Sequence, residues 1–241
     1  MKNGMGDDMT REAYLSQMLT TYSLVKVLAN KNGGKVLQLR HKEQGKDLVV
    51  RSFDQKVVAY QRLCDLSCEN LPLIYDVIDA DDGQLVLEEY IEGLTVTQVM
   101  EVGRYRYRGV KRVLQGLLNG LSVLHDRGLI HRDVKPDNIM VTPNGRVVLV
   151  DFNATREIST ASQDTVVMGT VGYASPEQLG VTQSDARTDL YAVGILLNVM
   201  LTGKHPSEQM ATGKAGKIVR KCTAVNPNER YQTAQNLADA L

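Results

Sequence analysis

The sequence has no excess of either charge, no long hydrophobic run and no internal repeat. Lys plus Arg and Asp plus Glu each number 28, so the formal net charge is +0 at pH 7. A balanced chain has no overall field that would attract it to nucleic acid or to an anionic membrane. No apolar stretch approaches the roughly 18 residues of a membrane-spanning helix. The first residues also do not resemble a signal peptide.

Cysteine is scarce as well. The three cysteines, at positions 64, 68 and 222, cannot all pair with one another. They also lack the paired spacing with downstream His or Cys that a zinc site requires. We interpret Cys64 and Cys68, about one helical turn apart, as buried small side chains. Together these absences predict a protein of a reducing compartment, the cytoplasm, with no membrane span.

The composition is that of a globular protein, with 43% hydrophobic and 23% charged residues among 241. That length suffices to bury a core, as one large domain or as two lobes. Strand patterns fill the first third and helical periodicity the remainder, with a boundary near residues 90–94. The expected strands are 23–28, 35–39, 48–53, 74–79 and 84–89, and the expected helices are 10–19, 57–66, 110–124, 189–201 and a closing helix within 225–241.

One basic run alternates arginine with tyrosine over residues 104–108 and continues with Lys111 and Arg112. Such a run could form a nucleic-acid patch. The solvated start of a helix explains the same residues and suits the neutral chain better. We therefore expect no nucleic-acid partner.

Residues 138–151 contain a candidate cation site. Asn144-Gly145 lies between two β-branched runs, which is a strong sequence signal for a β-hairpin. A two-residue turn there places Asn138 opposite Asp151, with Cα atoms roughly 5 Å apart. An amide oxygen and a carboxylate at that separation suit Mg²⁺, which also takes waters and phosphate oxygens. An Asn that caps its own backbone and a solvated Asp would fit as well, because the turn register could slip by one residue.

The stretch from His131 to Asn138 combines a base, cations, acids and an amide directly after a helix-like apolar pattern. Asp133 lies beside the candidate cation site, where a carboxylate keeps its charge and can accept a hydroxyl proton during phosphoryl transfer. Lys135 is placed to neutralise charge on a transferring phosphoryl group. We interpret His131 as a packed structural imidazole and Arg132 as a cation for a phosphorylated or acidic loop.

Taken together, these residues resemble the eukaryotic-like protein kinase superfamily, and most closely its bacterial Ser/Thr branch. The similarity covers about residues 23–241, in the order of the family's motifs. Residues 131–133, 151–153 and 175–177 match the catalytic loop, the metal-binding triplet and the close of the activation segment, although Asn153 replaces the triplet's glycine. Lys135-Pro136 is the form that Ser/Thr kinases carry. In combination these motifs are highly specific.

The resemblance implies an α+β, bilobal, kinase-like fold. A small lobe of antiparallel sheet plus one helix, at about residues 23–89, would precede a larger, mostly helical lobe at about 94–241. A hinge at about 89–93 would join them. Residues 1–22 would be an N-terminal extension, helical in part.

The resemblance also assigns roles in the large lobe. It implies that Asp133 is the catalytic base, that Lys135 neutralises the transferring phosphoryl group, and that Thr170 hydrogen-bonds near both. Asn138 and Asp151 are implied as the Mg²⁺ ligands.

Two further contacts follow from the same resemblance. Glu177 is expected to pair with Arg230 near the end of the activation segment. Asp189, which opens an almost wholly apolar helix, is expected to lie against the catalytic loop.

The nucleotide-binding part departs from the family pattern. The first two glycine positions of the phosphate-binding loop are Ala29 and Lys31, and only Gly34, with Gly33 beside it, keeps the backbone freedom needed to reach phosphate. Lys31 could supply a replacement cation, although an exposed loop lysine is the simpler interpretation. The nucleotide contacts that the resemblance implies are Leu28, Gly33, Gly34, Val36, Arg51, Glu88, Glu89, Tyr90 and Ile91.

Arg51 stands where the family carries a strand lysine, and Ala59 stands where it carries the partner glutamate on the following helix. That lysine–glutamate pair is required in the family's active state. Arg is a wider, planar donor, so the exchange is not conservative at a phosphate site. The resemblance places Glu88 at the gatekeeper position of the adjacent strand. We predict that Arg51 pairs with Glu88, because a semi-buried cleft would otherwise leave each charge unpaired.

The implied function is an ATP- and Mg²⁺-dependent Ser/Thr protein kinase that transfers the γ-phosphoryl group to protein hydroxyls. The alternative is a pseudokinase, a nucleotide-binding or scaffold module with little turnover, which the altered small lobe favours. Retention of Asp133 and Asp151 favours an enzyme, with activity weakened by Arg51 and Ala59. Autophosphorylation is expected within residues 154–168, which include Ser159, Thr160, Ser162 and Thr165.

Overall fold

The computed structural model describes residues 9–31, 34–64, 66–157, 170, 172–179 and 184–241. These residues form two compact units. The first unit comprises the described part of Met1–Ser67 together with Pro72–Tyr90, and the second comprises Cys68–Leu71 and the described part of Ile91–Leu241. The main division therefore falls between Tyr90 and Ile91.

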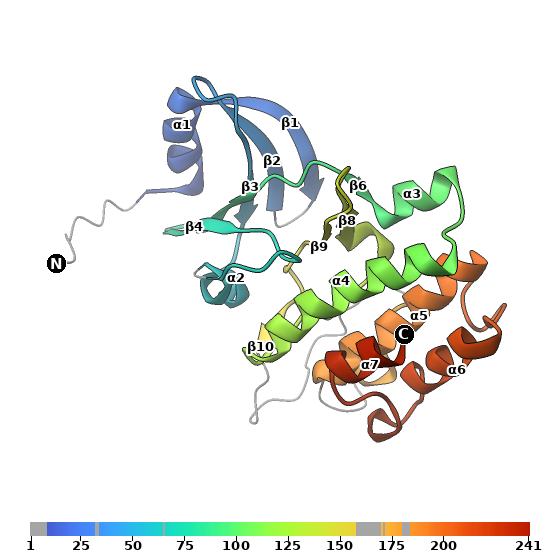
Figure 1. Ribbon diagram of the computed structural model, residues 1–241. Coiled ribbons are helices and arrows are strands. Elements are labelled where there is room, and N and C mark those ends of the chain that lie inside the picture. The colour runs from blue at the N-terminus through green and yellow to red at the C-terminus, as the bar shows by residue number, and fades with distance from the viewer. Residues whose placement is uncertain (1–8, 32–33, 65, 158–169, 171, 180–183) are drawn as a thin grey trace. The chain divides into compact units, whose positions relative to one another are not determined.

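A five-stranded antiparallel sheet forms the framework of the first unit (Figure 1). Its strands lie in the order β1-β2-β3-β5-β4. All five strands expected from the sequence are present, and each is longer than predicted. They are β1 Tyr22–Lys31, β2 Gly34–His41, β3 Asp47–Phe53, β4 Ile74–Ala80 and β5 Gly83–Glu89.

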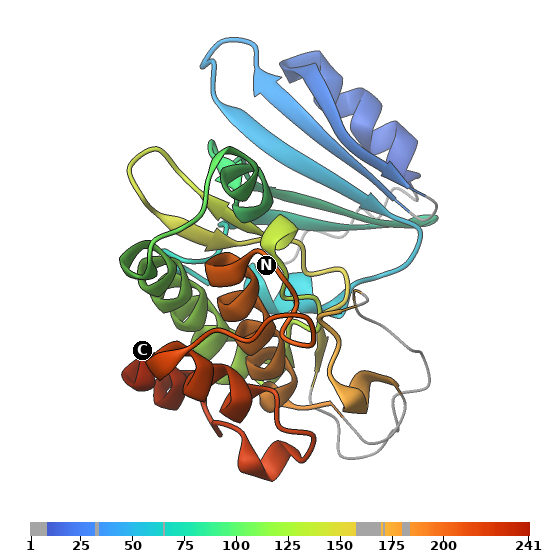
Figure 2. The same ribbon diagram turned by 90° about the vertical axis from the view of Figure 1, so that its right-hand side faces the viewer.

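Helix α1, Arg11–Thr21, covers one face of this sheet (Figure 2). Thr10 caps the helix by accepting a hydrogen bond from the Ala13 amide at 3.3 Å. Because side chains alternate between the two faces along each strand, every second residue of a strand points toward the helix. The buried cluster on this face consists of Leu39, Leu48, Val50 and Leu85, and the helix contributes Tyr14, Leu15 and Met18 to it.

Helix α2, Val58–Leu63, lies on the opposite face and is shorter than the sequence suggests. The rings of Phe53 and Tyr60 are 5.5 Å apart. Because Phe53 is an odd number of positions from Val50, its ring points away from α1 and toward α2. The first unit is thus a sheet with a helix on each face.

The second unit is mainly helical. Helix α4, Tyr107–His125, buries the apolar stripe predicted from its sequence, and α5, Ala186–Thr202, is buried on nearly every side, also as predicted. None of the described helices has the length and apolar character to cross a bilayer. The remaining α-helices are α3 Val96–Val102, α6 Gly213–Cys222 and the closing helix α7 Ala234–Ala240. The short strands are β6 Leu94–Thr95, β7 Leu129–Ile130, β8 Ile139–Val141, β9 Val147–Leu149 and β10 Arg156–Glu157.

The β8–β9 hairpin shows that one prediction was wrong. In the observed register Asn138 lies opposite Val150 rather than Asp151, and the Val150 amide donates to the Asn138 carbonyl at 2.9 Å. The loop spans residues 143–145, and Gly145 adopts a φ of 85°. A three-residue loop that ends in a left-handed glycine is a common alternative to the two-residue turn, and Asn-Gly is compatible with both.

The packing of α1 on the sheet can be tested with two leucines of this helix. Leu15→Asp should lower the free energy of unfolding by about 2 kcal/mol or more, because it places a charge on the apolar cluster. Leu19, which is 43% exposed, provides the matched control, and Leu19→Asp should change stability by less than about 0.5 kcal/mol. Urea unfolding followed by circular dichroism measures both. Equal effects would show that α1 does not pack as described.

Candidate active site

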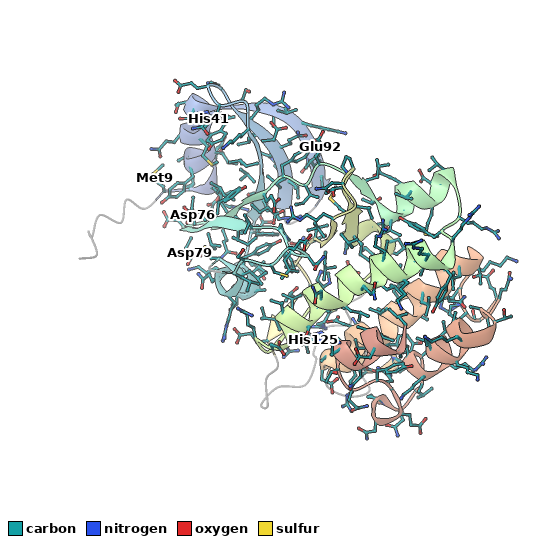
Figure 3. The ribbon with its side chains drawn as sticks, in the orientation of Figure 1. Met9, His41, Asp76, Asp79, Glu92 and His125 are labelled. Carbon is teal, nitrogen blue, oxygen red and sulfur yellow. The ribbon has the colours of Figure 1, made fainter. Side chains whose placement is uncertain are left out.

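A buried carboxylate at the start of α5 holds the loop between β7 and β8. Asp189 is 1% exposed and accepts backbone hydrogen bonds from His131 at 3.0 Å and from Arg132 at 2.8 Å. His125, labelled in Figure 3 at the end of α4, contacts the same carboxylate through Nε2 at 2.8 Å. Burial opposes ionisation of Asp189, but the contact with His125 and the backbone donors outweigh it and hold its pKa below the usual range. The predicted contact between Asp189 and the catalytic loop is confirmed.

Asp133 stands at the centre of a hydrogen-bond network. Lys135 Nζ donates to Asp133 Oδ2 at 2.7 Å and to Thr170 Oγ1 at 2.8 Å, and the Thr170 hydroxyl donates to Asp133 Oδ1 at 2.7 Å. Asn138 Nδ2 donates to Asp133 Oδ2 at 2.9 Å. Burial opposes ionisation of Asp133, but the bonds from Lys135 and Thr170 outweigh it, so its pKa lies below the usual range. The predicted contacts of Thr170 with Asp133 and Lys135 are confirmed.

The predicted metal ligands, Asn138 and Asp151, lie at the ends of the β8–β9 hairpin but not at paired positions. The Asn138 amide nitrogen donates to Asp133, so Oδ1 is the side-chain atom suited to binding a cation. Within the part of the chain that the structure describes, no three His, Cys, Asp or Glu residues group as a metal centre. An amide oxygen and a carboxylate still fit Mg²⁺, which is often held by one or two protein carboxylates together with waters and phosphate oxygens.

Backbone strain is concentrated at this site. Among the described residues other than glycine, Arg132 and Asp151 have positive φ, at 67° and 69°. The imidazole of His131 is fully buried. It meets the ring of Phe152 edge-on at 5.5 Å, and its Nε2 is 3.3 Å from the Val150 carbonyl oxygen. Burial lowers the pKa of His131 although nearby carboxylates oppose this. The predicted structural role of this histidine is confirmed.

A buried ion pair joins Glu177 to Arg230, near the end of the chain. Arg230 Nη1 and Nη2 donate to the two carboxylate oxygens of Glu177 at 2.6 and 2.9 Å. The side chains are 0% and 3% exposed. Thr188 adds a bond to Glu177 at 3.0 Å, and Arg230 also donates to the Ala224 carbonyl at 2.8 Å. The predicted Glu177–Arg230 pair is confirmed, in the bidentate form that makes arginine–carboxylate pairs strong.

In the first unit, predicted nucleotide-binding residues share the sheet face that α2 covers. Val36 and Arg51 are cross-strand partners on β2 and β3. Arg51 Nε donates to Glu88 Oε1 on β5 at 2.6 Å, and the two side chains are 9% and 4% exposed. The predicted pairing of Arg51 with Glu88 is confirmed.

The structure places the other predicted nucleotide contacts at the ends of these strands. Leu28 is exposed beside a register shift in β1. Gly34 opens β2, where a Cβ atom would lie 2.6 Å from the Ser52 carbonyl oxygen. Glycine is therefore required there by the close approach of two strands, whatever its role toward phosphate.

The predicted hinge residues lie on both sides of the division between the units. The Glu89 amide donates to the Leu73 carbonyl at 2.8 Å, and its carboxylate accepts from the Leu73 amide at 3.2 Å. Tyr90 ends the first unit and Ile91, which is buried, begins the main part of the second. Gly33, Ser159, Thr160, Ser162 and Thr165 lie outside the described residues.

Two residues that support the loop were not identified from the sequence. His125 contacts Asp189, and Gln178 Nε2 donates to the Arg132 carbonyl at 2.8 Å. A histidine in the last turn of a helix is common for reasons of helix capping, and Gln178 belongs to no pattern. Neither carried a signal that separates it from ordinary helix or loop residues.

Comparison with known proteins assigns this arrangement to a family. A family model described as "Protein kinase domain" matches residues 22–241. The chain is 32% identical over 229 residues to a probable serine/threonine-protein kinase of Clostridium perfringens, covering 84% of this chain and 33% of that protein. Identity to serine/threonine-protein kinase D of Synechocystis is 28% over 219 residues, covering 81% and 42%. Identity to serine/threonine-protein kinase PknL of Mycobacterium tuberculosis is 40% over 141 residues, covering 56% and 35%.

The chain therefore belongs to the protein kinase family, and these relatives carry the names of bacterial serine/threonine kinases. The predicted α+β kinase fold, with an antiparallel sheet in one unit and mostly helices in the other, is confirmed. The chain spans 33–42% of the length of these three relatives.

The Glu177–Arg230 pair predicts how stability depends on pH. Glu177→Gln should destabilise the protein by about 3 kcal/mol at pH 7, because Arg230 then keeps a buried charge without its counter-ion. The pKa of Glu177 is lowered in the folded chain: burial opposes this, but the bonds from Arg230 prevail. The ionised pair therefore stabilises above the unfolded pKa of about 4.3, and that stability is lost as the pH falls through the folded pKa.

Urea unfolding at pH 7 and at about pH 3.5 measures the effect. The difference between the wild type and Glu177→Gln should shrink at the lower pH. Glu229, which directly precedes Arg230 and is exposed, is the matched control. Glu229→Gln should have little effect on the free energy of unfolding at either pH. A difference that is equal at both pH values would contradict the assignment.

Proposed function

We propose that this chain is an ATP- and Mg²⁺-dependent serine/threonine protein kinase domain, which transfers the γ-phosphoryl group of ATP to protein hydroxyls. The observation that carries the proposal is the contact of the Asp133 carboxylate, the Lys135 ammonium and the Thr170 hydroxyl, at 2.7–2.8 Å. Members of the protein kinase family generally use ATP and Mg²⁺. The names of the relatives support serine and threonine as acceptors.

Asp133 acts on the acceptor hydroxyl. As the hydroxyl oxygen bonds to the γ-phosphorus, the bond from that phosphorus to the β–γ bridging oxygen breaks and ADP leaves. The hydroxyl proton passes to an Asp133 carboxylate oxygen. Because the pKa of Asp133 is held low by Lys135 and Thr170 against the effect of burial, the carboxylate orients the hydroxyl first. It takes the proton late, when bonding to phosphorus has made that proton acidic.

Lys135 supplies positive charge where the transferring phosphoryl oxygens need it. Its ammonium contacts both Asp133 and Thr170, so the cation is positioned before a phosphate is bound. Thr170 joins its own segment to the catalytic loop by donating to Asp133 and accepting from Lys135.

Asn138 and Asp151 are the residues that would hold Mg²⁺. When bound, the cation neutralises charge on the phosphate oxygens. Asn138 also donates to the Asp133 carboxylate at 2.9 Å, so one side chain orients the base while its amide oxygen is available to the cation. This coupling of base and metal ligand supports the proposed roles.

The altered small lobe bears on the pseudokinase alternative. A pseudokinase has no need for a complete network around Asp133, and the presence of that network supports turnover. Arg51 and Ala59 replace the family's lysine–glutamate pair, so we expect weaker nucleotide binding together with retained chemistry.

We also propose that the domain acts in the cytoplasm on protein hydroxyls, including its own within residues 154–168, and binds no nucleic acid. The balanced charge of the chain supports the last point. The absence of a disulfide framework among its three cysteines supports a reducing compartment.

The role of Asp133 can be tested within its own loop. Asp133→Asn should lower phosphoryl transfer at least about 10²-fold, because the acceptor hydroxyl loses its base. Affinity for MgATP should stay within about threefold. Asp137, an exposed acid of the same loop, is the matched control, and Asp137→Asn should retain activity. Transfer of radiolabelled phosphate from ATP to the chain itself and to dephosphorylated casein gives the readout.

Equal transfer by the wild type and Asp133→Asn would refute the assigned role. A wild type that binds MgATP and transfers nothing would establish the pseudokinase instead.

A further inference from the structure

Arg51 and Glu88 lie on neighbouring strands of one sheet, offset by two positions. Arg51 is the cross-strand partner of Val86, and Glu88 follows Val86 by two residues on β5, so both charged side chains point to the same face. Diagonal neighbours of this kind are within reach of long side chains. The 2.6 Å contact between Arg51 Nε and Glu88 Oε1 lies almost entirely out of water.

Helix α2 offers this cation no carboxylate. Its residues, Val58–Leu63, include neither Asp nor Glu. Its inward side chains are Ala59, Tyr60 and Leu63, all buried. Ala59 occupies the position of the family's helix glutamate with a single methyl group, so α2 contacts the sheet through apolar and aromatic packing.

An ion pair between two strands of one sheet and an ion pair between a helix and a sheet respond differently when the helix shifts relative to the sheet. Strands β3 and β5 are joined by a continuous antiparallel ladder from Leu48–Glu89 to Phe53–Gln84. They cannot separate without breaking backbone hydrogen bonds, whereas a helix that packs on a sheet can shift as a unit. The distance between Arg51 and Glu88 is therefore set by the ladder and is independent of where α2 lies.

We propose, on the basis of the kinase function proposed above, that Glu88 is the positioning residue of Arg51, the cation for the nucleotide phosphates. This pair within the sheet replaces the pair that the family makes between strand and helix. Arginine suits the arrangement because its planar guanidinium carries five N–H donors on three nitrogens. Nε holds the carboxylate, and the guanidinium carries two further nitrogens, whereas a lysine has one nitrogen in all.

The consequence concerns regulation. In the family, the position of the helix controls whether the lysine–glutamate pair forms, and thereby whether the kinase is active. Here the cation keeps its carboxylate partner wherever α2 lies. Nucleotide affinity should therefore depend on Glu88 and be insensitive to loosening of α2.

The test compares two probes, MgADP and adenosine, by isothermal titration calorimetry. Glu88→Gln should weaken MgADP binding about 10-fold or more, because Arg51 loses its charged partner and its orientation. Adenosine binding should stay within about threefold, since the cation acts on phosphates alone. A variant that had merely lost its fold would weaken both ligands.

A second variant loosens α2 without touching the pair. Leu63→Ala removes a buried side chain from the inner face of α2 and should speed hydrogen exchange of the α2 amides. Its MgADP affinity should stay within about threefold of the wild type. Should Glu88→Gln fail to fold, the apolar double variant Arg51→Met/Glu88→Leu restores a packed interior and should bind adenosine but lose MgADP.

Two results would overturn the proposal. One is a folded Glu88→Gln variant that binds MgADP like the wild type or weakens both probes equally. The other is a Leu63→Ala variant that loses MgADP as strongly as Glu88→Gln. These readouts are separate from turnover. A wild type that binds MgADP in this Glu88-dependent way but transfers no phosphate contradicts only the proposed kinase activity. An active wild type whose MgADP affinity is unchanged by Glu88→Gln contradicts only this inference.

Discussion

The catalytic loop depends on one buried carboxylate. The Asp189 carboxylate accepts hydrogen bonds from the backbone amides of His131 and Arg132 and contacts the ring of His125. The end of α4, the loop between β7 and β8, and the start of α5 therefore meet at a single charge. A carboxylate removed from water is tolerated only when such donors satisfy it. In return it fixes the left-handed backbone at Arg132, directly before Asp133. The backbone conformation therefore places the Asp133 carboxylate within hydrogen-bond distance of Lys135 and Thr170.

The two units differ in how far they keep the family's charged groups. The second unit retains the network around Asp133 and the buried Glu177–Arg230 pair. The first unit carries Arg51 and Glu88 on adjacent strands, where the resemblance predicts a lysine paired with a helix glutamate. Both arrangements obey the same constraint, since each buried cation has a carboxylate in direct contact. In the proposed function the groups assigned to chemistry lie in the second unit, and Arg51, the cation proposed for the nucleotide, is held by a carboxylate of its own sheet.

Local patterns predicted much of this structure. Alternation predicted the five strands of the first unit, and helical spacing predicted the buried stripe of α4. The Arg51–Glu88 pair was predicted from the family resemblance, which placed the two charges on adjacent strands, together with the need to pair semi-buried charges. The predicted register of the β8–β9 hairpin was wrong because Asn-Gly is compatible with two loop lengths that the local sequence does not distinguish. Contacts from far along the chain hold β9: Asn70 donates to the Val147 carbonyl at 2.8 Å and accepts from the Leu149 amide at 3.0 Å. No local pattern reveals such partners.

The central claim is that Asp133 works as an ionised carboxylate throughout the physiological range. The most direct test is the pH dependence of kcat for phosphoryl transfer at saturating MgATP. Burial opposes ionisation but the bonds from Lys135 and Thr170 hold the pKa of Asp133 below the ordinary value of about 3.9. We therefore expect a flat profile from about pH 9 to about pH 5, with kcat lost only at lower pH as the carboxylate takes up a proton. A kcat that falls between about pH 7 and pH 6, or no transfer at any pH, would contradict the account.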